Sequence, residues 1–428
     1  MPNQWMEQAK SKGFSAEEKA TVRELAARYM DLALLPVNGQ RIARMKKSNG
    51  LTPGRPIVWL HEIPWNEMNI GDELTITSRH SFARAVEDYL RTSLYRWKHI
   101  QADTVLLPYY SIKKSFSSSG IGIDVREETI VKDKTNRIIS HKYEDQLDTL
   151  EKVEALKRPT ITAHPERDEI NLEMARELLG DTIPVKLLGH GVYYAPWDDI
   201  SRMRGVEPLL IDLWDRPELM HRTIERFSGF AASRFTQMEA LGLLEWNVPD
   251  LHCTPPYVDD LPSKEFDGIH SQKKDVWFRG TAQLFGSISP EMHEEFDLAY
   301  TQPLMEQFGL GYYGCCEPLD HVIFKLMKFQ NLRKVGVPPW ANVSRCAEML
   351  GGRYVVARKP NPAFVAGTFN EEAVRNETAE TVEACLRYGC AYELVLKDIS
   401  TVSYRPQNLM QWVRVVNEVL DQYYGAGA

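Results

Sequence analysis

The chain has 428 residues, of which 43% are hydrophobic, so it can bury one large core or two ordinary ones. Its formal net charge of −8 argues against the broad positive surface that nucleic acids require, and we expect no nucleic-acid partner. Six cysteines are too few for a disulfide scaffold, and the first residues lack the pattern of a signal peptide. No run of eighteen apolar residues occurs. We therefore expect a cytoplasmic protein with reduced thiols and no membrane association.

Residues 1–50 have the pattern of an N-terminal helical arm, which precedes a main domain over residues 51–428. Ser15 and the two glutamates that follow Ala16 are typical of a helix start. The apolar stripe that this helix would bury consists of Leu25, Tyr29, Leu32 and Leu35.

Short apolar runs then alternate with helical patterns almost to the C-terminus, which favours a parallel α/β architecture. A charged, β-branched segment at 125–142 predicts an exposed hairpin inserted in this pattern. Asp215, Pro217 and Glu218 predict a capped helix start, and Ser289 predicts another, with a kink at Pro303. The predicted strands are 56–60, 104–110, 184–191, 243–248, 276–280, 335–340, 354–357 and 393–396, with one more directly before Cys315.

The stretch Gly311–His321 concentrates thiols, carboxylates and an imidazole after that last strand. Barrel enzymes keep their chemistry at the C-terminal ends of strands, and zinc accepts thiolate, imidazole and carboxylate ligands. Neighbouring residues of an extended strand point to opposite sides, so we expect only one of Cys315 and Cys316 to bind a metal, together with Glu317. The third ligand is expected from His252 or Cys253, which follow another predicted strand. A buried, purely structural cysteine pair is the alternative.

Aromatic residues follow several predicted strands and suggest a pocket for a flat, apolar substrate. Arg279 would supply a polar contact there, and His61, in the mouth of the first strand, would bind substrate or act as an acid or base. The aromatic residues that we expect to bind substrate are Trp65, Tyr110, Tyr193, Trp277, Tyr312 and Tyr313.

Three stretches resemble the uroporphyrinogen decarboxylase superfamily, a family of (β/α)8 barrels that includes zinc-dependent, corrinoid-linked methyltransferases. Leu209–His221 is similar to a strand end followed by the family's D-x-P-E-L helix opening. Residues 288–296 are similar to its SPE-x-F-x-E-F helix, and 404–409 to the start of its final helix. The resemblance implies a TIM-type (β/α)8 barrel, here with the N-terminal arm and the inserted hairpin.

The residues at the site separate the branches of that superfamily. The decarboxylase branch carries arginines after its first strand, whereas residues 60–65 here contain none, which disfavours true uroporphyrinogen decarboxylase activity. The methyltransferase branch has a His-x-Cys-Gly strand end and a later cysteine. Cys315 and Cys316 match the position of a family cysteine, but Tyr313 and Gly314 stand where the histidine would be, and Lys397 and Asp398 replace the later cysteine.

The resemblance therefore implies an O-demethylase-type methyltransferase that uses Zn²⁺ as a Lewis acid on a methoxylated aromatic or another small methyl donor. No D-x-H-x-x-G cobalamin motif occurs in the chain, so the corrinoid would come from a partner protein. Two alternatives remain open: a metal-independent decarboxylase of a small acid that uses Arg279 or Lys397, and a non-catalytic barrel that binds a corrinoid or tetrapyrrole. A homodimer is an open alternative to a monomer.

Overall fold

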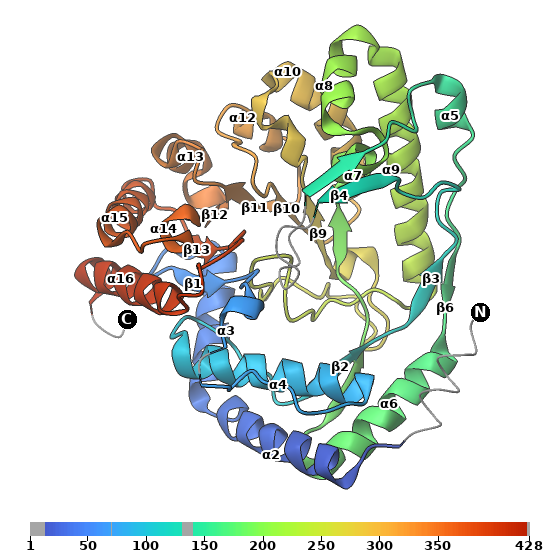
Figure 1. Cartoon of the computed structure of the whole chain (residues 1–428). Helices are drawn as coiled ribbons and strands as arrows, with labels where there is room; N and C mark the ends of the chain where they lie inside the picture. Colours follow the sequence, from blue (N-terminus) through green and yellow to red (C-terminus); the bar gives the residue numbers. More distant parts are fainter. Residues whose placement is uncertain (1–12, 70, 131–139, 426–428) are drawn as a thin grey trace.

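The computed structural model describes residues 13–69, 71–130 and 140–425. The fold is mixed α/β, with a seven-stranded parallel sheet in the order β1-β13-β12-β11-β10-β9-β8 (Figure 1). The strands are β1 (Ile57–Leu60), β2 (Tyr110–Lys113), β3 (Phe116–Ser118), β4 (Glu127–Ile130), β5 (Ser140–Tyr143), β6 (Ile161–Ala163), β7 (Val185–Leu188), β8 (Val192–Tyr194), β9 (Trp277–Gly280), β10 (Leu310–Tyr313), β11 (Leu332–Val337), β12 (Val355–Arg358) and β13 (Tyr392–Leu396).

Helices cover the outer side of the curved sheet and continue around the molecule (Figure 1). They are α2 (Ala16–Ala33), α3 (Pro36–Asn49), α4 (Ser81–His99), α5 (Leu150–Glu154), α6 (Pro165–Leu179), α7 (Pro196–Arg204), α8 (Val206–Asp215), α9 (Pro217–Ala240), α10 (Pro290–His293), α11 (Ala299–Met305), α12 (Ile323–Leu326), α13 (Val343–Leu350), α14 (Ala363–Ala366), α15 (Glu371–Arg387) and α16 (Gln407–Tyr424).

The sheet bends around the centre of the view but, over the described residues, its ladder ends at β1 and β8. Strands β2 and β7 form a separate two-stranded parallel sheet, and both fall between β1 and β8 in the sequence. Strand β8 begins four residues after β7 ends. At the other edge of the seven-stranded sheet, the Asp103 N–H donates to the carbonyl of Val58 in β1 at 2.8 Å. The parallel α/β class is confirmed, and a closed (β/α)8 barrel stays a prediction.

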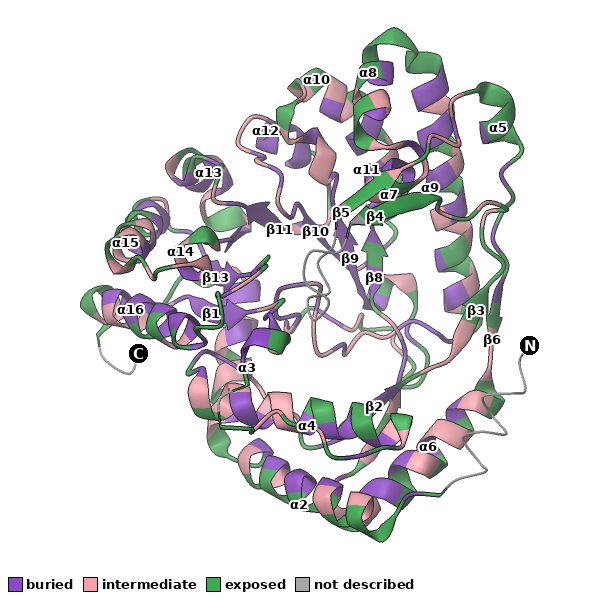
Figure 2. Ribbon diagram, in the orientation of Figure 1, coloured by how far each residue is buried: buried purple, intermediate pink, exposed green. Residues whose placement is uncertain are grey.

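Strand alternation gives the sheet two different faces. The outer face packs apolar residues such as Phe278, Tyr313 and Val335 against the helices in the largest core cluster. The concave face instead carries charged residues: Arg279 pairs in register with Tyr312, and Tyr312 with Lys334 on the next strand. Figure 2 shows that most of the seven-stranded sheet is buried, while exposed residues lie on the outer helices and on the separate β4–β5 hairpin. A buried polar interior is therefore enclosed by an apolar shell.

The N-terminal helices follow the sequence prediction with one exception. Ser15 caps α2 in a reciprocal capping box with Glu18. Leu25 and Tyr29 are buried against α4 and α6, but Leu35 is 42% exposed because it precedes α3 instead of continuing the stripe of α2. The division into an arm and a main domain stays a prediction.

Several local predictions are wrong in detail. The apolar run 209–214 lies in helix α8 and not at a strand end, and Asp215 is the last residue of that helix. Helix α9 therefore starts after Arg216, with no side-chain cap. The run 104–110 is mostly irregular, since β2 begins only at Tyr110, and the run 243–248 forms a single bridge between Leu244 and His190.

Two other segments refine the prediction. The hairpin expected at 125–142 is present as antiparallel β4 and β5, while residues 131–139 lie outside the described part. The helix predicted after Ser289 begins with a side-chain cap, passes through a π-helical turn at Glu294–Leu298 and continues as α11 with Pro303 inside it.

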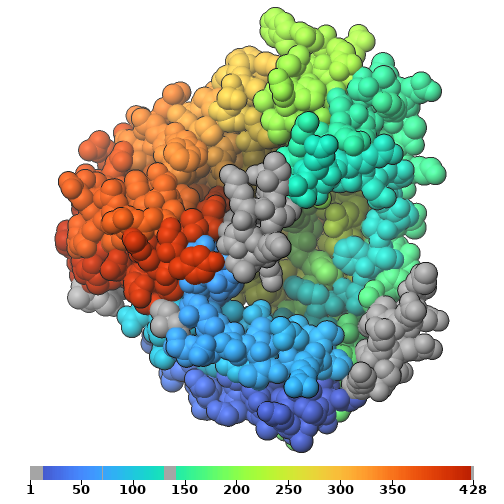
Figure 3. All heavy atoms as spheres, viewed as in Figure 1, coloured from blue at the N-terminus to red at the C-terminus, as the bar shows by residue number. Residues whose placement is uncertain are grey.

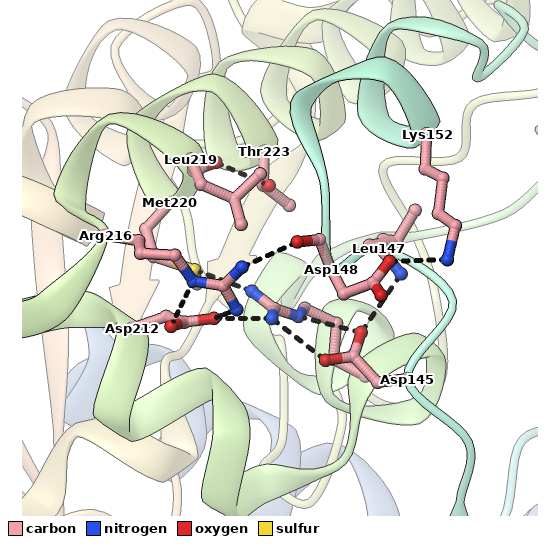
Figure 4. A network of polar contacts seen from close by, with 10 residues as sticks. Asp145, Leu147, Asp148, Lys152, Asp212, Arg216, Leu219, Met220 and Thr223 are labelled. Atoms are coloured by element: carbon pink, nitrogen blue, oxygen red, sulfur yellow. Dashed lines mark hydrogen bonds and ion pairs between the residues drawn. The ribbon is translucent and has the colours of Figure 1, made fainter.

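A buried ion-pair network fixes α7, α8 and α9 to the segment before α5 (Figure 4). The guanidinium of Arg204, which is 1% exposed, binds the carboxylates of Asp145 and Asp212. Asp212 also accepts hydrogen bonds from Arg216, whose guanidinium donates to the Asp148 carbonyl. Removing one partner from such a network leaves a buried charge uncompensated.

Within the described ranges, no helix has both the length and the apolar character that crossing a bilayer requires.

Candidate functional site

The candidate site lies where the C-terminal ends of the parallel strands meet, as expected for a barrel-like sheet. Figure 3 shows a hollow near the middle of the face in view. The segment 250–254 reaches the same place from the chain between α9 and β9. The residues gathered here are His61 and Glu62 after β1, His252 and Cys253, Cys315, Cys316 and Glu317 after β10, and Lys397 and Asp398 after β13.

The backbone of this site is unusually strained. Eight non-glycine residues in the described chain have positive φ, and four of them belong to the site. They are Glu62 (52°), His252 (35°), Cys253 (76°) and Asp398 (56°). Such conformations cost energy and occur where the surroundings hold a side chain in a required direction.

Gly314 makes the turn that brings the cysteines into the site. Its φ is 95°, and a Cβ at this position would lie 2.3 Å from Leu319 Cδ1 and 3.3 Å from the Gly336 nitrogen. Because β10 ends at Tyr313, Cys315 and Cys316 lie in the loop beyond it. The expectation that strand alternation separates the two thiols is therefore wrong: their sulfur atoms are 3.6 Å apart.

Cys315 is the centre of a buried sulfur cluster. The Lys397 ammonium lies 3.0 Å from its sulfur and 3.4 Å from that of Cys316. Hydrogen bonds from Cys253, and then from Cys316, lower the pKa of Cys315, with smaller contributions from His252 and Arg279. The same hydrogen bonds raise the pKa of the Cys253 and Cys316 thiols. The arrangement favours one thiolate, on Cys315, that accepts from two neutral thiols.

Lys397 keeps its charge beside this thiolate. Burial favours the neutral amine, but the Coulombic attraction of Cys315 and its neighbouring thiols outweighs burial and raises the pKa of Lys397. The ammonium also lies 3.1 Å from Asp398 and 3.7 Å from Glu62. The Cys316 sulfur in turn lies 3.0 Å from the Asp398 carboxylate, which is a second possible acceptor for its proton.

A second donor group shares Cys253 with the sulfur cluster. One ligand atom each of His61, Glu62 and Cys253 lie within 4.8 Å of one another, the spacing that a metal site needs. The Cys253 sulfur is 3.9 Å from the Glu62 carboxylate, and His61 Nε2 is 2.8 Å from Asp250. The His252 ring packs against that of Tyr193 at a tilt of 48°, with ring centroids 4.6 Å apart. Thiols, imidazoles and a carboxylate on converging loops form a donor set that suits zinc.

Glu317 is turned away from the sulfur atoms. One of its oxygens accepts from the Thr281 hydroxyl at 2.7 Å and the Ala282 N–H at 3.1 Å, and the other accepts from the Cys315 N–H at 2.8 Å. Burial, and then the nearby Cys315 thiolate, raise the pKa of Glu317. These bonds hold the cysteine loop against β9, and the role of Glu317 as a metal ligand stays a prediction.

Arg279, Tyr312 and Tyr193 are brought together beside this cluster. The guanidinium carbon of Arg279 lies 4.1 Å from the Tyr312 ring centroid and 5.9 Å from that of Tyr193. Burial opposes the charge of Arg279, but the Tyr312, Cys315 and Tyr193 groups outweigh it and raise its pKa. Two of the six aromatic residues predicted to bind substrate therefore stand at the site.

The other four aromatic residues lie elsewhere in the fold. Trp65 packs edge-on against Tyr95, and Tyr110 packs against Tyr89. Trp277, at the opposite end of β9, donates its indole N–H to the Pro256 carbonyl and lines a cavity of about 220 Å³. Tyr313 faces the helices, where its hydroxyl contacts His293 at 2.8 Å and Asp297 at 2.6 Å.

Sequence reasoning missed the charged residues inside the sheet. Lys334 and Glu393 form a buried ion pair of 2.9 Å, and Lys359 lies near the Tyr312 ring. The signal was present, because Lys334 and Glu393 stand inside mostly apolar strands. Asp198, in the first turn of α7, accepts a hydrogen bond from Gln283 at 2.8 Å, and burial raises its pKa to about 6.

Comparisons with known proteins add little to this picture. No protein-family model matches the sequence, and no curated protein matches it. The chain is similar to a solved structure of a methyltransferase from Methanosarcina mazei, with 10% identity and a TM-score of 0.46 over 90% of this chain and 99% of that one. At this score the likeness carries no argument about fold or activity.

Proposed function

We propose that the protein is a zinc-dependent methyltransferase that moves a methyl group from a methoxylated aromatic compound to the cobalt of a corrinoid on a partner protein. One observation carries the proposal: Cys253 belongs both to the sulfur cluster around Cys315 and to the group with His61 and Glu62. The resemblance of the sequence to the uroporphyrinogen decarboxylase superfamily supports the same function.

The residues that would hold zinc are Cys253, Cys315 and a third ligand from Glu62, His61 or His252, which would leave the fourth coordination position open to substrate. We prefer Glu62 to Glu317 as the carboxylate, because both Glu317 oxygens are already engaged by protein donors. A zinc ion bound there supplies Lewis acidity at the ether oxygen and makes the departing phenolate a better leaving group. The strained φ angles of Glu62 and Cys253 fit this role, because they fix ligand directions before any metal binds.

The remaining site residues prepare the thiolates and the substrate surface. Lys397 stabilises the Cys315 thiolate, which is the form that binds a metal. Glu317 fixes the loop that carries that cysteine. The ring of Tyr193, which is 40% exposed, offers a flat surface to an aromatic substrate, and a corrinoid protein would dock on the face where the C-terminal ends of the strands meet.

The test is an anaerobic assay of the zinc-loaded protein with reduced cobalamin and methoxybenzenes, followed by methylcobalamin absorbance and phenol release. We expect activity in the wild type and in Cys346→Ala, which changes a buried helical cysteine outside the site. Cys253→Ser should lose activity and zinc together. Phenol release without cobalamin, or full activity in Cys253→Ser, would overturn the proposal.

A further inference from the structure

Arg279 presents an unused hydrogen-bonding edge inside the concave face of the sheet. The residue is fully buried, and its Nη1 donates to the Gly280 carbonyl. Its Nε and Nη2 find no hydrogen-bond acceptor within the described residues. In a guanidinium these two nitrogens form one edge, whose parallel N–H groups match the two oxygens of a carboxylate.

The geometry holds this edge in a fixed direction. Arg279 and Tyr312 are paired across β9 and β10, and the guanidinium lies 4.1 Å from the Tyr312 ring centroid. Stacking uses the face of a guanidinium and leaves its edges available for hydrogen bonds. The bond from Nη1 to Gly280 fixes the rotation of the plane.

A second buried cation, Lys359, lies near the Tyr312 hydroxyl. Lys359 is 2% exposed, and its Nζ lies 5.5 Å from the Tyr312 ring centroid. Within the described chain this nitrogen and the Tyr312 hydroxyl interact with each other, and neither has a hydrogen bond to another group. The other two inward lysines are satisfied, since Lys334 binds Glu393 at 2.9 Å and Lys397 binds Asp398 at 3.1 Å. Arg279 and Lys359 therefore keep hydrogen-bonding capacity that no acceptor in the described chain fills, and burying such groups unfilled is costly.

We infer that Arg279, Lys359 and the Tyr312 hydroxyl bind the carboxylate of a small-molecule ligand whose body extends toward the sulfur cluster. Identifying that ligand as the methyl donor, an aromatic carboxylate, rests on the proposed function. Of the two rings over Arg279, Tyr312 is fully buried and Tyr193 is 40% exposed. Access to the arginine therefore requires Tyr193 to turn aside.

The test is calorimetric titration of the full-length protein with benzoate, benzamide and inorganic phosphate, with and without zinc. We expect benzoate to bind in both forms and benzamide and phosphate to bind at least tenfold more weakly. Arg279→Lys, which keeps the charge but loses the two-nitrogen edge, and Lys359→Met should each weaken benzoate binding at least tenfold. Arg202→Lys, an exposed arginine on α7, should leave it unchanged.

Circular dichroism establishes that each variant is folded before it is titrated, and Lys359→Met decides the question if Arg279→Lys does not fold. Equal binding of benzoate and benzamide, tighter binding of phosphate, or wild-type affinity in either variant would overturn the inference. Because benzoate has no methyl group to transfer, benzoate binding stands even if methyl transfer is never observed. Methyl transfer from uncharged methoxybenzenes alone would support the proposed function and contradict the carboxylate site.

Discussion

The ion pair of Lys334 and Glu393 inside the sheet allows a quantitative prediction. The two groups are 2.9 Å apart, with side chains 0% and 2% exposed. Lys334→Met leaves the Glu393 carboxylate buried, and among the described residues only the Thr254 hydroxyl remains as a side-chain donor to it. Breaking a buried pair in this way costs about 3–5 kcal/mol.

Protonation of the unpaired carboxylate sets an upper limit on this loss of unfolding free energy. A glutamate with an unfolded-state pKa of about 4.3 escapes the penalty by protonation, which costs about 1.4 kcal/mol for each pH unit above that value. The loss of unfolding free energy in Lys334→Met is therefore capped at about 4 kcal/mol at pH 7 and about 1 kcal/mol at pH 5. The stability deficit of the variant should grow as the pH rises between these values.

The assay is urea unfolding followed by circular dichroism at pH 5 and pH 7. Lys334→Met/Glu393→Gln removes both charges and keeps an acceptor for Thr254, so it should recover most of the loss at pH 7. Lys328→Met is the control, because that lysine is 60% exposed in its pair with Glu294 and should change stability by less than about 1 kcal/mol. An equal deficit at both pH values, or a double variant as unstable as Lys334→Met, would refute the reasoning.

Three further changes have defined outcomes. Arg204→Met, in the network of Figure 4, should lower the unfolding free energy by about 3–5 kcal/mol in urea, and a loss below about 1 kcal/mol would contradict its structural role. Burial raises the pKa of Asp297 from 3.8 to about 7, so the folded state binds its proton more tightly and stability falls as the pH rises through this window. Asp297→Asn, which keeps an acceptor for Tyr313, should therefore gain melting temperature over the wild type between pH 4 and pH 8, and a constant difference would argue against this explanation. Gly314→Ala meets both a positive φ and a 2.3 Å contact, so it should reduce zinc content and lower stability by about 1–3 kcal/mol, measured by metal analysis and urea unfolding. Wild-type zinc content in that variant would show that the turn does not position the cysteines.

The sequence predicted the fold class well because buried parallel strands appear as short apolar runs. The runs at 56–60, 276–280 and 393–396 correspond to β1, β9 and β13. The run at 209–214 was assigned to a strand end but lies in helix α8, since a short apolar run does not by itself distinguish a strand from a buried helix.

The sequence predicted where the site residues lie along the chain better than it predicted which of them contact one another. Chain order placed Cys315 and Cys316 after a strand, and they lie there. The direction of each side chain depends on turns with positive φ, which place Glu62 near Cys253 and which residue type does not reveal. For the same reason, the sequence alone could not show that Glu317 turns to Thr281.

The most direct test of the central claim is zinc K-edge X-ray absorption on the purified, zinc-loaded protein. The account predicts one zinc per chain, with sulfur ligands at about 2.3 Å and nitrogen or oxygen ligands at about 2.0–2.2 Å. Cys253→Ser and Cys315→Ser should each lose a sulfur ligand or the metal, while Cys346→Ala keeps the wild-type spectrum. A protein that retains no stoichiometric zinc, or whose zinc has no sulfur ligand, would contradict the account.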